Sequence, residues 1–304
     1  MAGAIMRSAQ FKQVVEPILN THFDGVYEQR VDEYKLVFEN EPNPIERAYH
    51  EESVWFGFNS APELPDGQPV TYDEGGILYN KRYPYPVFGL AFALTRVLVE
   101  DGEHIRIGSR YSKHLAQSMQ ETIETVHANH LNRAFNASFV GGDGVALVSA
   151  SHPVIGGTQS NLLTSGALSQ TTLEQALITI RTAKDSRGKF SRFIPKHVIV
   201  SPSNMLNIEV ILNSVLRSGS ANNDINPVKS MGQVKDAVVI SRLTSSTAWF
   251  VQTDVMDGLK TLWRRKVEKS MEGDFETDSM RYKSTMRFGS GWTDWRTIYG
   301  NAGV

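Results

Sequence analysis

The clearest pattern in the chain is an alternation of large and small residues in the extended run Val87–Val99. A second extended run, Thr71–Arg82, precedes it, and a Tyr-Pro-Tyr-Pro break separates the two. This pattern predicts a long β-hairpin within residues 61–101. Because an isolated two-stranded hairpin is only marginally stable in water, other parts of an assembly should cover its large apolar face. Four side chains form that face: Phe88, Leu90, Phe92 and Leu94.

A long amphipathic helix is predicted next. Apolar residues recur at spacings of three and four from Tyr111 to Ala134, and Ser109 is a suitable N-cap, so the helix should run from Ser109 to about Asn136. At 1.5 Å per residue it would measure about 42 Å, close to the roughly 50 Å diameter of a compact chain of this size. The hairpin and the helix together predict an elongated molecule.

Residues 140–256 have the pattern of a compact α/β unit. Thr171 and Glu174 have the spacing of a capping box and predict the start of one helix, and Ser201, followed by proline, predicts the start of another. The polar, turn-rich residues 214–233 predict a projecting loop. Short apolar runs predict strands at 197–200, 237–241 and 249–252.

Two strands, 259–269 and 280–288, are predicted on either side of an acidic turn at 271–278. In one interpretation the charges pair across the strands within one subunit, and in the other the acidic turn contacts basic strands of a symmetry-related copy. The candidate interface residues on this hairpin are Arg264, Arg265, Asp274, Glu276, Asp278, Arg281 and Lys283.

The N-terminal third differs in charge from the rest. Residues 1–60 predict an arm with a short helix from Ser8 to about Leu19. Residues 1–100 hold 15 acidic and 8 basic residues, a net charge of −7, whereas the remainder holds 18 and 23, a net charge of +5. The N-terminal third is therefore predicted to lie against a basic surface of its own subunit or of a neighbour, unless both are simply solvated surfaces.

Composition excludes several classes of protein. A net charge of −2 over 304 residues argues against a protein that coats nucleic acid, and there is neither an apolar run of about 18 residues nor a signal peptide. We therefore expect a protein that contacts no membrane and stays in a cytoplasm. The absence of cysteine excludes disulfides, thiolate nucleophiles and cysteine zinc sites.

The best catalytic candidates lie on the long helix, where Glu124, His127 and His130 share one side. Such a set can bind a metal, but a di-iron bundle needs a second Glu-x-x-His, and the chain has none. A Walker A loop, GxGxxG, GxSxG and HExxH are also absent. We therefore predict a protein that is not an enzyme and needs no cofactor.

The order of these features resembles the major capsid protein of tailed bacteriophages, in particular the Mu-like major head subunit family. The matching segments are residues 72–75 before the hairpin, 88–96 followed by the acidic pair 100–101, and the closing run 287–296. The resemblance covers nearly the whole chain. It implies an α+β tailed-phage capsid fold, with an N-terminal arm at 1–60 and an extended loop at 61–101. The peripheral domain, with the long spine helix, would comprise 102–139 and 257–289, and the axial α/β domain 140–256 and 290–304.

The resemblance also implies a function. Such subunits form pentamers and hexamers of an icosahedral shell that encloses double-stranded DNA in the virion, after assembly in the bacterial cytoplasm. The expected partners are further copies of this chain, a separate scaffolding protein, a portal protein and a decoration protein. Some relatives crosslink a loop lysine to a neighbour, and Lys81 is the only lysine between Lys35 and Lys113.

Three alternatives stay open at this stage. An encapsulin-type nanocompartment shell shares the fold and would contain a cargo enzyme instead of DNA. A metal-dependent enzyme would use Glu124, His127 and His130. A tail-tube protein fits poorly, because such subunits resemble β-barrels and need no long helix.

Overall fold

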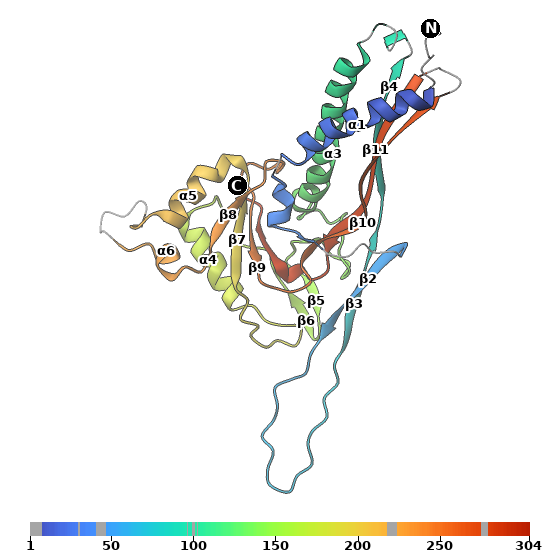
Figure 1. The fold of residues 1–304 in the computed structure, drawn as a ribbon. Helices are drawn as coiled ribbons and strands as arrows, with labels where there is room; N and C mark the ends of the chain where they lie inside the picture. The colour runs from blue at the N-terminus through green and yellow to red at the C-terminus, as the bar shows by residue number, and fades with distance from the viewer. Residues whose placement is uncertain are drawn as a thin grey trace, which may run out of the picture.

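One long helix, α3 (His104–Asn132), packs against both main sheets of the protein. The computed structural model describes residues 8–29, 31–40, 47–95, 97–98, 101, 103–217, 224–274 and 279–304, with side chains from residue 15 onward. Figure 1 shows an elongated molecule, with an α/β body on one side, a helix pair along a long sheet, and a projecting loop at the opposite end. The expectation of an elongated shape is confirmed.

The long sheet has the strand order β1-β10-β11-β4. Its strands are β1 (Glu39–Asn40), β10 (Leu259–Asp274), β11 (Ser279–Trp292) and β4 (Val87–Thr95). The predicted strand pair exists as β10 and β11, each longer than expected, and the two are antiparallel. Alternate residues of β11, among them Tyr282, Met286 and Phe288, are buried in the core that α3 contributes to.

Helix α1 (Ser8–Tyr27) packs on α3 and extends beyond its predicted end. Leu19 and Phe23 are buried there, and the Ser112 hydroxyl donates to the Leu19 carbonyl at 2.7 Å. A Cβ on Gly108 would lie 3.2 Å from Leu19, so the glycine allows the close approach. The short helix η1 (Glu33–Leu36) follows and places Tyr34 on the C-terminal part of α3, where its ring stacks on His127.

The α/β body contains a sheet of order β12-β9-β7-β8. We call it the axial body, after the predicted axial domain. Helices α4 (Gln170–Arg181) and α5 (Met205–Asn213) share a core with one face of this sheet, while Ile199 and Phe250 belong to the core around α3. The predicted strands are confirmed as β7 (Pro195–Val200), β8 (Asp236–Val239) and β9 (Trp249–Thr253), and β12 (Ile298–Asn301) completes the sheet. Smaller elements are β5 (His152–Val154), β6 (Gly157–Gln159), η2 (Pro202–Asn204), α6 (Pro227–Met231) and η3 (Trp295–Thr297).

The predicted hairpin between 71–82 and 87–99 is wrong in its pairing. Strand β3 (Gly76–Pro84) pairs with β2 (Tyr49–Phe56), which lies in the segment predicted as arm, and β4 pairs with β11. The reason lies in the Tyr-Pro-Tyr-Pro segment: proline favours extended backbone in the residue before it and cannot donate to a strand pair. The chain therefore continues from β3 into β4 instead of turning back (Figure 1).

Two helix starts also differ from the prediction. Helix α3 begins at His104 after Glu103 as N-cap, so Ser109 lies inside the helix. Helix α4 is capped by Ser169 and Thr172, which exchange side-chain and backbone hydrogen bonds at 3.2 and 2.9 Å. Glu174 instead accepts hydrogen bonds from Gln170 and Arg217. At α4 a neighbouring pair of residues forms the capping box, whereas Glu103 makes no side-chain cap hydrogen bond at the start of α3.

Candidate assembly surfaces

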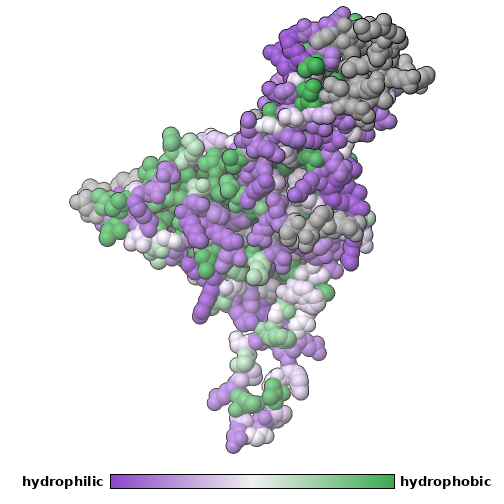
Figure 2. All heavy atoms as spheres, in the orientation of Figure 1, coloured by the Kyte–Doolittle hydropathy of each residue, from purple (hydrophilic) through white to green (hydrophobic). Residues whose placement is uncertain are grey.

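A projecting loop, residues 57–75, connects β2 to β3 (Figure 1). The loop contains four acidic residues and no basic residue. It also exposes large apolar side chains, and hydrophobic residues are visible on its surface in Figure 2. They are Phe58, Leu64, Val70 and Tyr72. An acidic segment with unburied apolar groups is typical of a surface that another molecule covers.

The β2–β3 hairpin that carries this loop is fixed to the end of the long sheet. Glu52 on β2 accepts from the Lys260 ammonium at 2.8 Å and from the Thr293 hydroxyl. Burial opposes ionisation of Glu52, but these hydrogen bonds hold its carboxyl pKa below the ordinary value. Lys260 keeps a raised pKa in spite of its own burial, because Glu52 and Asp257 surround it. The root of the hairpin is thus held by a buried charge pair.

The long sheet has one outer face that α3 does not cover. Arg281, Lys283 and Arg287 alternate along β11 with buried residues, and so point to this outer face. The strand register places Ala93 opposite Arg281 and Ala91 opposite Lys283. The cations of β11 therefore lie between the small residues of β4 and two exposed carboxylates of β10, because the register also places Glu272 opposite Arg281 and Glu268 opposite Thr285. We call this outer face the basic face.

The large side chains of β4 are mostly covered within the chain. Phe88 stacks on Phe288 at 5.1 Å, Phe92 lies against Tyr282 at 5.3 Å, and Leu94 is fully buried. Leu90 alone of the four predicted residues is half exposed, at 51%. Helix α3 and strand β11 provide the cover that the sequence suggested a neighbour would provide, and an interface role for Leu90 stays a prediction.

The charged hairpin residues make contacts within the subunit. Arg281 pairs with Asp274 across the strands at 2.5 Å, as one of the two interpretations predicts. Arg265 approaches Glu268 at 3.4 Å and donates to Thr285, and Arg264 donates to the Arg47 carbonyl. Lys283 lies exposed on the basic face. The predicted residues Glu276 and Asp278 lie outside the described residues.

Lys81 lies near the root of the hairpin and far from the loop tip in sequence. Its ammonium donates to the Val140 carbonyl at 3.2 Å and stands 5.2 Å from the centre of the Trp292 ring. Burial lowers the pKa of Lys81, although Asp143 opposes the shift. Lys81 also lines a cavity of about 660 Å³ with Arg82, Arg133 and Phe139.

The candidate catalytic residues on α3 do not converge on one site. His127 donates from Nδ1 to the Ile123 carbonyl at 2.6 Å, and Nε2 accepts from Thr261 at 2.7 Å. Burial lowers the pKa of His127 to about 4 and that of His130 to about 3. Glu124 opens to a separate cavity of about 300 Å³, whereas His130 lines the larger one. Within the described ranges, no group of three or more histidine, aspartate or glutamate side chains is placed to hold a metal ion.

The acidic N-terminal third does lie against basic residues of its own subunit. Ion pairs join its carboxylates to distant parts of the chain, namely Asp24–Lys269, Glu33–Arg242, Glu52–Lys260 and Asp73–Arg187. These pairs confirm the intrasubunit form of the charge prediction. No helix in the described part of the chain is both long and apolar enough to cross a membrane.

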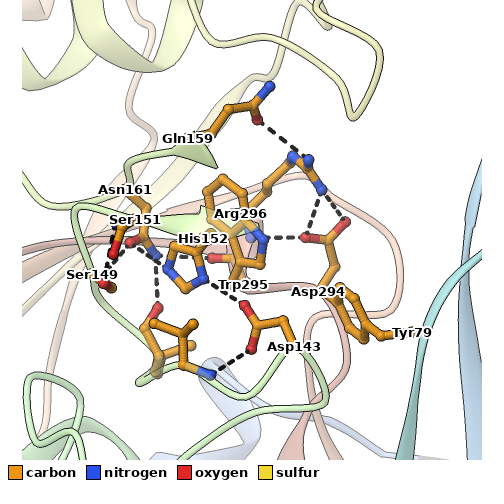
Figure 3. A network of polar contacts seen from close by, with 12 residues as sticks. Tyr79, Asp143, Ser149, Ser151, His152, Gln159, Asn161, Asp294, Trp295 and Arg296 are labelled. Carbon is orange, nitrogen blue, oxygen red and sulfur yellow. Dashed lines mark hydrogen bonds and ion pairs between the residues drawn. The ribbon is translucent and has the colours of Figure 1, made fainter. Parts of the chain in front are cut away.

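A buried polar network that the sequence analysis missed joins the 140–161 region to the C-terminal segment (Figure 3). His152 contacts the Asp143 carboxylate at 2.6 Å through Nδ1 and the side-chain amide oxygen Oδ1 of Asn161 at 3.0 Å through Nε2. The side-chain amide nitrogen Nδ2 of Asn161 donates to three backbone carbonyls, those of Leu147, Trp295 and Ile298. Both ring nitrogens of His152 therefore face oxygen atoms of buried side chains, which fixes the orientation of the ring.

The C-terminal side of this network contains Asp294, Trp295 and Arg296. The Trp295 ring stacks on His152 at 4.1 Å, and Arg296 approaches the Asp294 carboxylate at 3.4 Å. Burial raises the pKa of Asp294, although Arg296 opposes the shift. The sequence contains the glycine-rich run 140–144 and His152. Nothing in it indicates that residues about 140 positions apart meet in the fold.

The arrangement of these elements is shared with solved phage capsids. The capsid of Cyanophage P-SCSP1u is 13% identical over 88% of this chain and 86% of that chain, with a TM-score of 0.57. The procapsid of bacteriophage JBD30 is 15% identical over 97% and 75%, with a TM-score of 0.52. A phage-related protein from Bordetella bronchiseptica RB50 is 16% identical over 95% and 96%, with a TM-score of 0.51. The fold is therefore that of a viral shell subunit.

The sequence match specifies the family. Residues 86–301 match the phage capsid protein family, and the chain belongs to it. No curated protein matches the sequence. The protein is accordingly a structural subunit of a phage capsid and a component of the virion. The predicted phage capsid fold is confirmed, while the narrower Mu-like assignment stays a prediction.

Proposed function

We propose that this chain assembles with itself into pentamers and hexamers of an icosahedral shell that encloses double-stranded phage DNA. Its peripheral domain comprises 102–139 and 257–289, and its axial domain 140–256 and 290–304, with the loop 214–233 at the capsomer axis. The hairpin 49–84 is the extended loop, because β2 and β3 are the strands that carry it. Strand β4 is then counted with the peripheral domain, whose sheet it joins.

The observation that carries this proposal is the complementarity between the projecting loop and the basic face. Loop 57–75 is acidic and exposes apolar side chains, whereas the basic face combines Arg281, Lys283 and Arg287 with small residues. The loop projects away from its own subunit (Figure 1), so its own basic face does not cover it. The loop of one copy therefore lies on the basic face of the next, where opposite charges fix the register and apolar burial stabilises the contact.

The assembly partners follow from this role. Assembly takes place in the bacterial cytoplasm with a separate scaffolding protein, a portal protein occupies one vertex, and a decoration protein binds the outside. The DNA is enclosed without sequence-specific contacts, which agrees with a net charge of only −2.

The first test is electron microscopy of the chain expressed alone and with its scaffolding partner. Closed shells of uniform diameter, or rings of five and six subunits, are expected. A monodisperse monomer or dimer under both conditions would contradict the proposal. Shells from infected cells should contain DNA, whereas a cargo enzyme in its place would support the encapsulin-type alternative.

A charge exchange tests the proposed contact itself. The variant Arg281→Glu with Lys283→Glu should abolish shells, because it places like charges against the acidic loop. Adding Glu63→Lys and Asp66→Lys in the same chain should restore them. Lys196→Glu with Lys235→Glu is the control matched for net charge and should assemble normally. If the two reversals do not rescue each other, this loop does not meet this face.

A further inference from the structure

Two basic side chains from a distant turn hold the base of the projecting loop. Arg187 donates to the Glu74 carbonyl and approaches the Asp73 carboxylate at 3.5 Å. Lys189 donates to the Phe58 carbonyl. Phe58 lies where the chain leaves β2, and Glu74 lies where it returns to β3. The turn therefore forms hydrogen bonds with both ends of the loop.

The loop has little else to fix its direction. Among the described residues, the other hydrogen bonds of 57–75 are internal, such as the one from the Asn59 amide to Asp73 at 2.6 Å. Those internal bonds, together with Arg187, hold the pKa of the Asp73 carboxyl below its ordinary value. Arg187 itself is only 14% exposed, and its guanidinium stands 5.0 Å from the Phe56 ring. This contact is packed, unlike that of a freely solvated arginine.

The turn that carries Arg187 and Lys189 is internally bonded. The Asp185 carboxylate accepts from the backbone amides of Arg187 and Lys189 at 2.8 and 2.9 Å, and the Asp185 amide donates to the Lys189 carbonyl at 2.7 Å. Gly188 has a φ of +82°, a conformation that favours glycine. The turn therefore presents its two cations in a defined direction.

The same turn is attached to the buried network of Figure 3. Gln159 donates to the Asp185 carbonyl at 2.6 Å, and Arg296 donates to the Ser186 hydroxyl at 3.1 Å and to Gln159 at 3.3 Å. A continuous series of hydrogen bonds thus runs from the core of the axial body through the turn to the base of the loop.

We propose that the turn 184–190 is a brace that sets the direction in which the loop 57–75 leaves the subunit, with Arg187 as the positioning residue. Ten extended residues reach about 33 Å, so a change of about 10° at the base would displace the tip by roughly 6 Å. Such a displacement exceeds the tolerance of an interface contact. The consequence for shell geometry rests on the proposed function, whereas the bracing itself is a property of the single subunit.

Spin-label distance measurements on the unassembled full chain test the brace, and the absence of cysteine makes specific labelling simple. Labels at two exposed positions, Gln68→Cys in the loop and Ser203→Cys in the axial body, report the loop direction. Arg187→Ala should broaden the distance distribution and shift its centre by about 5 Å or more, by the lever estimate above. Arg187→Lys should fall between, because a lysine keeps one donor. Lys184→Ala is the control, since that side chain faces Phe190 instead of the loop.

Two further measurements keep the result interpretable. Hydrogen exchange of residues 57–75 should quicken in Arg187→Ala while exchange in the axial sheet stays unchanged. If Arg187→Ala does not fold, Asp73→Asn removes the ion pair from the loop side and should give a smaller broadening. Distances equal to those of the parent chain in Arg187→Ala would overturn the brace, even if the parent chain forms shells. A parent chain that forms no shells, with the distance change present, would overturn the proposed function and leave the brace intact.

Discussion

The buried network around Asn161 and the projecting loop 57–75 are both polar, but they use polarity in opposite ways. In the network every donor of Asn161 is used within the subunit, and the side chain is fully buried. In the loop, Glu63, Asp66 and several large apolar side chains project from the body without a cover in the same chain. The comparison indicates that folding free energy and assembly free energy come from separate regions, so substitutions should affect one and not the other.

The largest expected effect is on stability, from Asn161→Ala. The substitution removes the side-chain donor to three buried backbone carbonyls and the acceptor of the Ser149 amide, which should cost about 3–5 kcal/mol. Thermal unfolding of the unassembled chain should therefore shift down by roughly 10 °C. Ser160→Ala, at an exposed hydroxyl, should shift it by less than about 2 °C. Equal shifts for both would show that the network does not stabilise the fold.

In the loop, substitutions are expected to reduce assembly and to leave the stability of the subunit unchanged. Leu64→Ser with Val70→Ser should leave the unfolding temperature within about 2 °C of the parent chain, because both side chains are exposed in the subunit. The same variant should lose shells in electron micrographs, because the apolar area is then missing from the subunit contact. Normal shells from this variant would show that a surface other than this loop drives assembly.

Substitution of Glu124 should change stability by an intermediate amount that depends on pH. Burial raises the pKa of its carboxyl to about 7; Oε2 accepts from the Tyr34 amide, and Arg242 opposes the shift. Because the carboxyl is more acidic in the unfolded chain, its contribution to stability is fully present below about pH 4.5 and is lost as pH rises towards 7. Glu124→Gln should therefore unfold a few degrees higher than the parent chain at pH 8 and at the same temperature at pH 4. An unchanged difference across this range would contradict the assigned pKa.

The smallest expected effect concerns Lys81. Its ammonium is bound at the Val140 carbonyl beside Trp292, near the root of the hairpin and away from the exposed loop. Shells of the parent chain and of Lys81→Arg should both give only the monomer band on a denaturing gel. A ladder of higher bands that disappears in Lys81→Arg would instead establish the crosslink that some relatives make.

Much of the fold could be predicted because its signals are local. The axial strands are short apolar runs, and α3 has an apolar stripe, so both were found with errors only at their ends. Strand pairing is not local: 87–95 alternates equally well for a partner at 76–84 or at 279–287. The two prolines that decide between these partners were interpreted as a turn. The Asn161 network could not be predicted for the same reason, because its contacts are not local and a single buried asparagine produces no periodic pattern in the sequence.

The pairing of β4 with β11 also bears on how the chain is synthesised. The two strands begin about 190 residues apart, and β12 lies almost at the end of the chain. At a ribosomal rate of about 5–20 residues per second, β4 and α3 wait roughly 10–40 s for the strand that covers them. Until then their apolar faces are exposed, and most of the subunit folds only after release from the ribosome. Production of shells is therefore expected to depend on chaperones that hold nascent chains, and to fall steeply at temperatures where such chaperones are saturated.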